Sequence, residues 1–292
     1  MHEFIEYMKK ERHKANNTLL AYERDLVAFR RFLKERGVDE FKDCTDNDAI
    51  SYVIRLEKDN KSKATINRKV SVLRTFYNYE ADRKIVESNP FNKIKTAKND
   101  KRQIDYLTVE ETETLLELPY DDVKGIRDKA LLEFMYGTGA RVTEVVRLKF
   151  EDLNLRMNFV TLKDINEESR IVPLGRYAAS AMKEYIDVAY DSILGRPHTD
   201  DDDVFVNIRG GRLTRQGIWK ILKDYGTIMG IEERMTPQIL RDSFAVHILQ
   251  NGGDLKTLQE LMGFDDMSVG IAYLAVTEIH VRDVFSRCHP RA

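Results

Sequence analysis

The stretch TPQILRDSFAVHILQNGGDLKTLQELMGF, residues 236–264, decides how the second half of this chain folds. Apolar residues recur at helical spacing over 237–251, where Pro237 suits the first helical position and Gly252-Gly253 breaks the pattern. Two short helical segments follow. Arg241 therefore lies near the start of a helix. Taken alone, an arginine in such a place forms a surface ion pair more often than a binding site.

A second stretch, GTGARVTE at residues 137–144, predicts a glycine-containing turn that leads into a helix. It follows a strongly apolar helical segment at 125–136 and places Arg141 in the first turn of the next helix. Backbone N–H groups at a helix start and a guanidinium fork both favour a phosphate. The pattern indicates an anion site, with a surface ion pair as the alternative for Arg141.

The sequence around these two stretches is mainly helical. Thr108-Val-Glu-Glu111 resembles a capping box that opens a helix. Helical periodicity returns over 175–189 and 215–229. Residues 158–163 and 170–174 predict two short strands around a polar turn. The second half of the chain is thus expected to be α-rich with a small hairpin.

The first hundred residues predict a separate helical domain. Helical periodicity predicts three helices there, over residues 18–35, 46–58 and 62–81. The segment KIKTAKNDKRQ at 93–103 is polar and basic, with almost no apolar content, and predicts an interdomain linker. The expected organisation is an N-terminal domain at 1–95, a linker at 96–105 and a C-terminal domain at 106–292.

Positive charge is concentrated early in the chain. Residues 1–100 contain 22 Lys and Arg against 17 Asp and Glu, whereas the rest contains 25 against 32, so the overall net charge of -2 hides a basic region. Within 61–98, ten basic residues stand against three acidic ones. A surface that follows a phosphate backbone requires such a concentration, although a solvated basic helix face has the same composition. The candidate phosphate contacts share one face of the 62–81 helix: Lys63, Arg68, Lys69 and Arg74.

Composition argues against several other classes of protein. No apolar run approaches the ~18 residues of a membrane span. Met1-His2-Glu3-Phe4 lacks the basic and then apolar pattern of a secretory signal. Cys44 and Cys288 suggest neither a disulfide framework nor a metal site. We therefore expect a cytoplasmic protein with no membrane partner.

Four segments together indicate a protein family far more specifically than either arginine alone. They are GTGARVTEVVRL (137–148), SRIVPLG (169–175), the opening stretch and IAYLAV (271–276). In order and spacing they resemble the tyrosine recombinases of the phage integrase family, most closely the bacterial Xer group. The likeness runs from NTLLAYERDL (17–26) to the last four residues and so covers essentially the whole chain.

The resemblance implies a mainly α, two-domain fold. A helical, SAM-like core-binding N-terminal domain and an α-rich catalytic domain with a small β-sheet or hairpin would grip duplex DNA as a clamp. In this family two arginines bind the scissile phosphate and a tyrosine hydroxyl attacks it, and Arg141, Arg241 and Tyr273 match those positions. Without the arginines, Tyr273 would be interpreted as a core aromatic between Ile271 and Leu274.

The implied reaction explains the residue types. Attack on phosphorus builds negative charge, which two guanidinium forks stabilise. A tyrosine hydroxyl must lose its proton, and the leaving 5′ oxygen must gain one. The phosphotyrosyl bond keeps the energy of the phosphodiester. The resemblance therefore implies no cofactor, no metal and no small-molecule substrate.

Three positions depart from the family pattern. Gln238 stands where the family has a histidine, and Phe264 replaces a later histidine. Glutamine can donate a hydrogen bond but cannot act as a base, and phenylalanine has no polar hydrogen. The family's hairpin lysine, its general acid, aligns with Ile165. Lys163, two residues earlier on the same strand face, is the candidate substitute.

The expected partners are duplex DNA and further recombinase subunits, either copies of this chain or a related recombinase, in a tetramer on two DNA sites. The tail at 278–287 predicts a mostly charged helix with a few apolar residues, which would dock on a neighbouring subunit or pack on its own domain. The departures keep open a second function, that of an impaired homologue that binds DNA with little cleavage. A third, a helical protein-interaction scaffold, predicts no salt-dependent DNA affinity, and the basic 61–98 segment argues against it.

Overall fold

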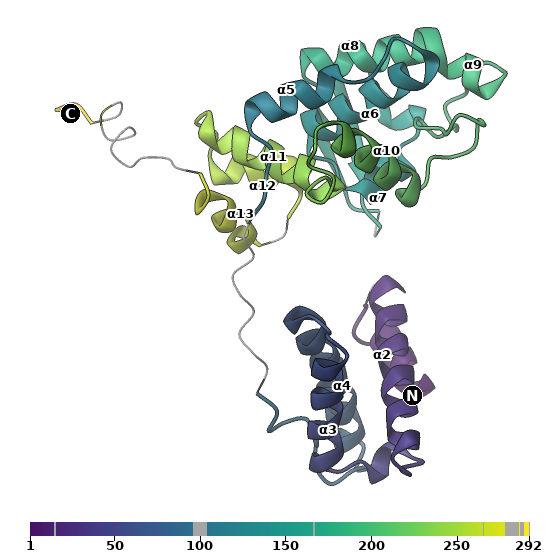
Figure 1. The fold of residues 1–292 in the computed structure, drawn as a ribbon, viewed down its shortest axis with the longest axis vertical. Coiled ribbons are helices and arrows are strands. Elements are labelled where there is room, and N and C mark those ends of the chain that lie inside the picture. The colour runs from purple at the N-terminus through teal and green to yellow at the C-terminus, as the bar shows by residue number, and fades with distance from the viewer. Residues whose placement is uncertain are drawn as a thin grey trace. The chain divides into compact units, whose positions relative to one another are not determined.

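The computed structural model describes residues 1–14, 16–95, 104–165, 167–264, 266–277, 286 and 289–291. The chain divides into two compact units, residues 1–102 and 103–292 (Figure 1). Most of the expected linker and nearly all of the expected tail helix at 278–287 lie outside the described residues. Within the described part, no helix is both long and apolar enough to cross a membrane.

The N-terminal unit is a helical bundle around an aromatic core. Its helices are α1 (His2–Lys10), α2 (Asn16–Glu35), α3 (Asp46–Lys58) and α4 (Lys63–Asp82). Thr45 opens α3 with a capping box, in which its side chain and that of Asp48 each accept the other's backbone N–H. In the core, the ring centroid of Phe29 lies 4.8 Å from that of Tyr52 and 5.3 Å from that of Phe91. Large aromatic side chains thus provide much of the apolar area that this small unit buries.

The C-terminal unit is α-rich with one small sheet. Its helices are α5 (Val109–Glu117), α6 (Val123–Thr138), α7 (Val142–Arg147), α8 (Arg176–Glu184), α9 (Asp191–Leu194), α10 (Arg215–Ile228), α11 (Pro237–Gln250), α12 (Leu255–Met262) and α13 (Met267–Leu274). The strands are β1 (Leu153–Asn154), β2 (Phe159–Lys163) and β3 (Ser169–Pro173). They pair antiparallel in the order β1-β2-β3, with Val160 opposite Val172 and Lys163 opposite Ser169.

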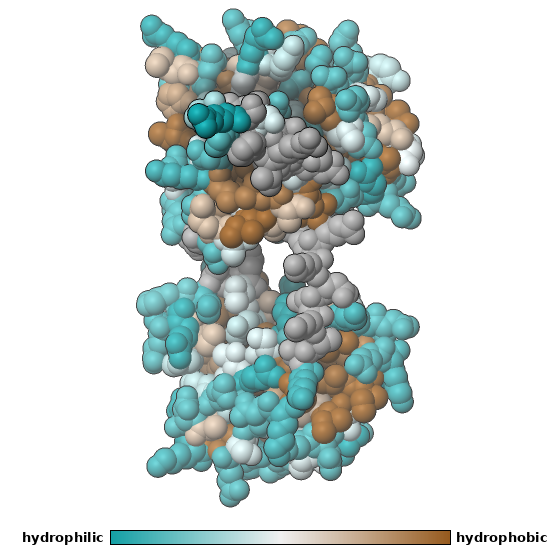
Figure 2. Space-filling view, turned by 90° about the vertical axis from the view of Figure 1, so that its left-hand side faces the viewer, coloured by the Kyte–Doolittle hydropathy of each residue, from teal (hydrophilic) through white to brown (hydrophobic). Residues whose placement is uncertain are grey.

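Helices α6 and α11 form the centre of this unit. Helix α6 buries Leu131, Leu132 and Phe134, and nearly every residue of α11 is buried. Other elements cover these helices, because α8 packs on α6 while α12 and α13 pack on α11. The start of α11 and the turn after α6 are therefore held inside the unit. Toward solvent, Figure 2 shows apolar patches among hydrophilic residues on both units.

The expected fold class, mainly α with a small sheet, is confirmed. Thr108 opens α5 with the expected capping box. The segment expected as one helix over 175–189 is divided, because α8 ends at Glu184 and a π-helical turn, Tyr185–Tyr190, follows. Helix α1 was not predicted. It has only nine residues, and its buried Phe4 and Met8 are too few for a clear period.

We predict that Gly139→Ala lowers the free energy of unfolding more than Gly195→Ala does. Both glycines have a left-handed backbone, with φ of +59° and +73°, which costs alanine about 1–2 kcal/mol. A Cβ at position 139 would also lie 2.5 Å from the Phe244 ring, whereas position 195 is open. Overpacking adds about 1–3 kcal/mol. Urea unfolding followed by circular dichroism measures both variants, and equal losses would contradict the close packing of Gly139.

Candidate active site

Two arginines from different elements converge in the C-terminal unit. Gly139, in the left-handed conformation, ends α6, and Arg141 is the N-cap residue of α7. Arg241 lies in the first turns of α11 and is buried. Its guanidinium donates to the backbone carbonyls of Gly139 and Met262, while Arg141 donates to the next carbonyl, that of Gly263. The turn after α6 and the end of α12 therefore hold the two guanidiniums in one region.

A buried carboxylate, Glu144, anchors this region. Arg170 of β3 donates to both of its oxygens, with Nη1–Oε1 at 2.6 Å and Nη2–Oε2 at 2.9 Å. The Arg141 backbone N–H and Nη1 also donate to Glu144, at 2.6 and 2.9 Å. Burial by itself would raise the pKa of Glu144, but the hydrogen bonds and charges of Arg170 and Arg141 outweigh it and hold that pKa below its ordinary value. Neither Glu144 nor Arg170 was predicted from the sequence as a site residue.

The two guanidiniums repel each other. Burial, and then the positive charge of Arg141, lower the pKa of Arg241 to about 10, while Glu144 and Tyr273 act in the opposite direction. Arg241 therefore remains charged at neutral pH. Two adjacent guanidiniums, one buried and one partly exposed, favour an anion with several acceptor oxygens. A phosphate group has this chemistry.

Tyr273 lies on α13 with 5% of its surface exposed. Its hydroxyl donates to Oδ1 of Asp242 at 2.6 Å. The same Oδ1 accepts from Nε2 of Gln238 at 2.8 Å. Gln238 and Asp242 are four residues apart on α11, so their side chains lie on the same face of that helix. The structure thus brings Tyr273, Arg241 and Gln238 together and adds Asp242, which the sequence analysis missed.

Phe264 packs in the apolar cluster that contains Tyr273. The cluster includes Leu258 and Met262 of α12, and Phe264 itself is buried. Its ring lies against Gly270 of α13, where a Cβ would come within 3.2 Å of it. Phe264 therefore supports the helix that carries Tyr273 through packing and offers no proton.

Lys163 lies at the end of β2 in an acidic setting. Its Nζ is 2.6 Å from Oδ1 of Asp152 and 3.4 Å from Oε1 of Glu151. The hydrogen bond and charge of Asp152 raise the pKa of Lys163 above its ordinary value. In this arrangement the ammonium is a weaker acid than an unpaired lysine. A different residue holds the hairpin turn: Arg147 donates to the Asp164 carbonyl and pairs with Glu167.

The four basic candidates of the N-terminal unit lie on α4. Arg68 and Lys69 both pair with Asp25, which is buried on α2, and the Lys69 Nζ–Oδ1 distance is 2.6 Å. Arg74 donates to the backbone carbonyls of Phe91 and Ile94. Lys63 is the first residue of α4. Intramolecular bonds thus orient Arg68, Lys69 and Arg74.

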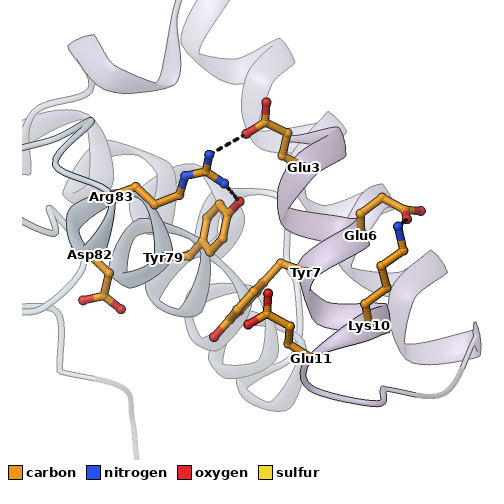
Figure 3. A pocket seen from close by; sticks show the side chains of 8 residues that line it. All are labelled: Glu3, Glu6, Tyr7, Lys10, Glu11, Tyr79, Asp82 and Arg83. Atoms are coloured by element: carbon orange, nitrogen blue, oxygen red, sulfur yellow. Dashed lines mark hydrogen bonds and ion pairs between the residues drawn. The ribbon is translucent and has the colours of Figure 1, made fainter.

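A hollow between α1 and α4 is mainly acidic, in contrast to the basic candidates on α4 (Figure 3). Its acidic residues outnumber its basic ones, and the lining is Glu3, Glu6, Tyr7, Lys10, Glu11, Tyr79, Asp82 and Arg83. Arg83 donates to the Tyr79 hydroxyl and pairs with Glu3 at 3.2 Å. A hollow with this charge repels a phosphate backbone. In the described residues, no group of three or more His, Cys, Asp or Glu side chains is arranged to hold a metal ion.

A mainly helical, two-unit chain with an arginine pair near a buried tyrosine has the architecture of a tyrosine recombinase. The phage integrase family model matches residues 105–280. The model of the phage integrase N-terminal SAM-like domain matches residues 1–84. The chain therefore belongs to the phage integrase family.

The resemblance to the Xer group is confirmed by relatives of nearly equal length. Tyrosine recombinase XerD of Oceanobacillus iheyensis is 38% identical over 291 residues, which cover 99% of this chain and 98% of that protein. XerD of Listeria innocua is 37% identical with the same coverage. The crystal structure of XerA recombinase is 25% identical, with a TM-score of 0.56, and the match covers 99% of this chain and 98% of that one. XerH site-specific recombinase bound to a palindromic difH substrate shares the fold, at 19% identity and a TM-score of 0.73, over 97% of this chain and 82% of that chain.

We predict that Glu144→Gln destabilises the protein by about 1.5–3 kcal/mol at pH 7, because it removes the buried charge that accepts hydrogen bonds from the partly exposed Arg170 and Arg141. The pKa of Glu144 is lowered in the folded state, so its contribution is present above the unfolded-state value and is lost as pH falls through the folded-state value. The difference between wild type and variant should therefore shrink below about pH 4.3. Urea unfolding at pH 7 and pH 3.5 measures it. A difference that is the same at both pH values would show that the Glu144 charge does not provide the stabilisation.

Proposed function

We propose that this chain is a site-specific DNA recombinase that cuts and rejoins strands through a transient 3′-phosphotyrosyl link at Tyr273. The observation that carries the proposal is that Arg141 and Arg241 bind the adjacent carbonyls of Gly263 and Met262, while the hydroxyl of buried Tyr273 is bonded to Asp242, the residue after Arg241. Relatives at 37–38% identity over nearly the whole chain are named tyrosine recombinases. The XerH structure is a post-cleavage complex with a difH substrate.

In the proposed reaction, Arg141 and Arg241 bind the scissile phosphate. Arg241 now donates to two neutral backbone carbonyls, and Arg141 donates to the Gly263 carbonyl and to Glu144. A phosphate oxygen is a stronger acceptor for a guanidinium, because the hydrogen bond is then assisted by charge on both sides. As Tyr273 attacks, the same donors stabilise the charge that builds on the phosphorus oxygens.

The three departing positions take different roles. Lys163 donates a proton to the leaving 5′ oxygen, which requires it to move away from Asp152 when DNA binds. The Gln238 amide, whose Nε2 binds Asp242, orients polar groups but transfers no proton. Phe264 packs beneath the helix of the nucleophile. The reaction needs neither metal nor cofactor.

For DNA binding, we propose that an N-terminal domain at 1–95 and a C-terminal domain at 106–292 grip opposite faces of the duplex, joined by a linker at 96–105. Lys63, Arg68, Lys69 and Arg74 would contact phosphates. The ion pair with Asp25 supports this for Arg68, because it aligns a guanidinium that remains half exposed. An aligned side chain loses less rotamer freedom when it binds.

Active recombination needs several subunits. We propose a tetramer on two duplex sites in the cytoplasm, formed with copies of this chain or with a related recombinase, in which the tail at 278–287 docks on a neighbour. The match to XerD of Oceanobacillus iheyensis over 99% of this chain supports the proposal. No membrane or small-molecule partner is part of this proposal.

One set of observations favours a second candidate function, a DNA-binding homologue with impaired cleavage. Gln238 and Phe264 cannot transfer protons. Lys163 is paired with Asp152, and in the turn beside it Glu167 forms an ion pair with Arg147. Each missing acid or base typically lowers the rate by about 10²–10⁴-fold.

We predict that the affinity for duplex DNA falls linearly with the logarithm of salt concentration, and that Arg68→Gln reduces the slope by about 0.9, the value for one phosphate contact. Fluorescence anisotropy across a salt series measures it. Arg55→Gln is the control, because Arg55 is an exposed basic residue of α3 that pairs with Asp59 and is not among the proposed contacts. Equal slope changes in both variants would assign the effect to net charge, and a salt-independent affinity would contradict DNA binding itself.

We predict that wild type forms a covalent adduct with a duplex nicked near the cleavage point, and that Tyr273→Phe abolishes it while duplex affinity is unchanged. Denaturing electrophoresis reads the adduct. Gln238→His and Phe264→His should speed its formation if these positions once supplied proton transfer. Lys163→Ala should slow cleavage of a normal substrate but spare one with a 5′-thio leaving group, which needs no acid. Tight DNA binding without any adduct, in wild type and in both histidine variants, would favour the impaired homologue.

A further inference from the structure

The hydroxyl of Tyr273 already has a carboxylate as its hydrogen-bond acceptor. Tyr273 Oη lies 2.6 Å from Oδ1 of Asp242, and both residues are at least 95% buried. Such a bond between a phenol and a carboxylate is short and charge-assisted. It joins the nucleophile of α13 to the helix that carries Arg241, one residue before Asp242.

The second bond to the same oxygen fixes the direction of this carboxylate. Gln238 Nε2 donates to Asp242 Oδ1 at 2.8 Å from one helical turn earlier. The amide stabilises negative charge on the oxygen but cannot accept a proton. Among the groups of this small network, the proton of Tyr273 can therefore move to Asp242 and not to Gln238.

We propose that Asp242 is the general base for Tyr273, in place of the proton-transferring groups missing at Gln238 and Phe264. This inference rests on the proposed recombinase function. As the bond from Tyr273 Oη to phosphorus forms and the bond from phosphorus to the 5′ oxygen breaks, the phenolic proton moves to Asp242 Oδ1. The 5′ oxygen takes its proton from Lys163. In religation the 5′ hydroxyl returns its proton to Lys163 as it attacks phosphorus, the bond from phosphorus to Tyr273 Oη breaks, and protonated Asp242 returns its proton to Tyr273.

The surroundings agree with this role. A carboxylate is a weaker base than a phenolate, so it gains the proton only as the phenolic oxygen bonds to phosphorus and loses basicity. The hydrogen bond that exists before attack makes that late transfer direct. Burial excludes bulk water, which would otherwise compete for the proton.

The test is Asp242→Asn, which keeps the size and a hydrogen-bond acceptor but cannot serve as the base. With the nicked duplex, adduct formation should slow by roughly 10²–10⁴-fold, as for loss of a proton-transferring group, while duplex affinity is unchanged. Asp242→Glu retains a carboxylate and should recover part of the rate. The matched control is Asp128→Asn, because Asp128 is also buried and accepts a tyrosine hydroxyl, that of Tyr225 at 3.0 Å. It should leave the cleavage rate of the folded protein unchanged.

A more acidic nucleophile separates proton transfer from positioning. Incorporation of a fluorinated tyrosine at position 273 should narrow the rate gap between wild type and Asp242→Asn, because a more acidic phenol needs less help from a base. An unchanged gap would make Asp242 a positioning residue and overturn its role as base. An Asp242→Asn protein that cleaves at the wild-type rate would overturn this inference alone. A wild-type protein that forms no adduct would overturn the proposed function and this inference with it.

Discussion

The candidate site depends on the burial of one carboxylate, that of Glu144. A buried charge is strongly unfavourable unless it is paired and hydrogen-bonded. Here Arg170 of β3 and Arg141 at the start of α7 supply the partners. Arg170 also donates to the Leu261 carbonyl at 2.7 Å, so the end of α12 is bound to the same charge. The sheet, the turn after α6 and the end of α12 must therefore assemble together.

That assembly brings the two positively charged guanidiniums of Arg141 and Arg241 close together. Glu144 offsets part of the repulsion between Arg141 and Arg241, yet the pKa of Arg241 remains lowered by burial and by Arg141. Backbone carbonyls of Gly139 and Met262 satisfy donors of Arg241 without neutralising its charge, while Arg141 binds both the Gly263 carbonyl and Glu144. An incoming phosphodiester supplies both acceptors and negative charge, so its binding relieves a cost already present in the folded protein.

The sequence predicted most of the fold from local patterns, and the proposed nucleophile from its resemblance to a family. Apolar periodicity located α4, α6 and α11, whereas the resemblance to the tyrosine recombinases indicated Arg141, Arg241 and Tyr273. The partners of these residues were not predictable. Asp242 meets Tyr273 across 31 positions, and Asp25 meets Arg68 across 43. Such contacts arise from the packing of distant helices, which periodicity within one helix does not encode.

Two departures from the family pattern are connected through the surroundings of Tyr273. Phe264 fills one side of α13 with an apolar ring, for which Gly270 leaves room. Phenylalanine at this position offers no hydrogen-bonding group, and the buried hydroxyl of Tyr273 needs a partner from another element. Helix α11 provides it, since Asp242 lies one turn after Gln238 and one residue after Arg241. The helix that holds Arg241, the proposed phosphate-binding arginine, thereby also holds the acceptor for the Tyr273 hydroxyl.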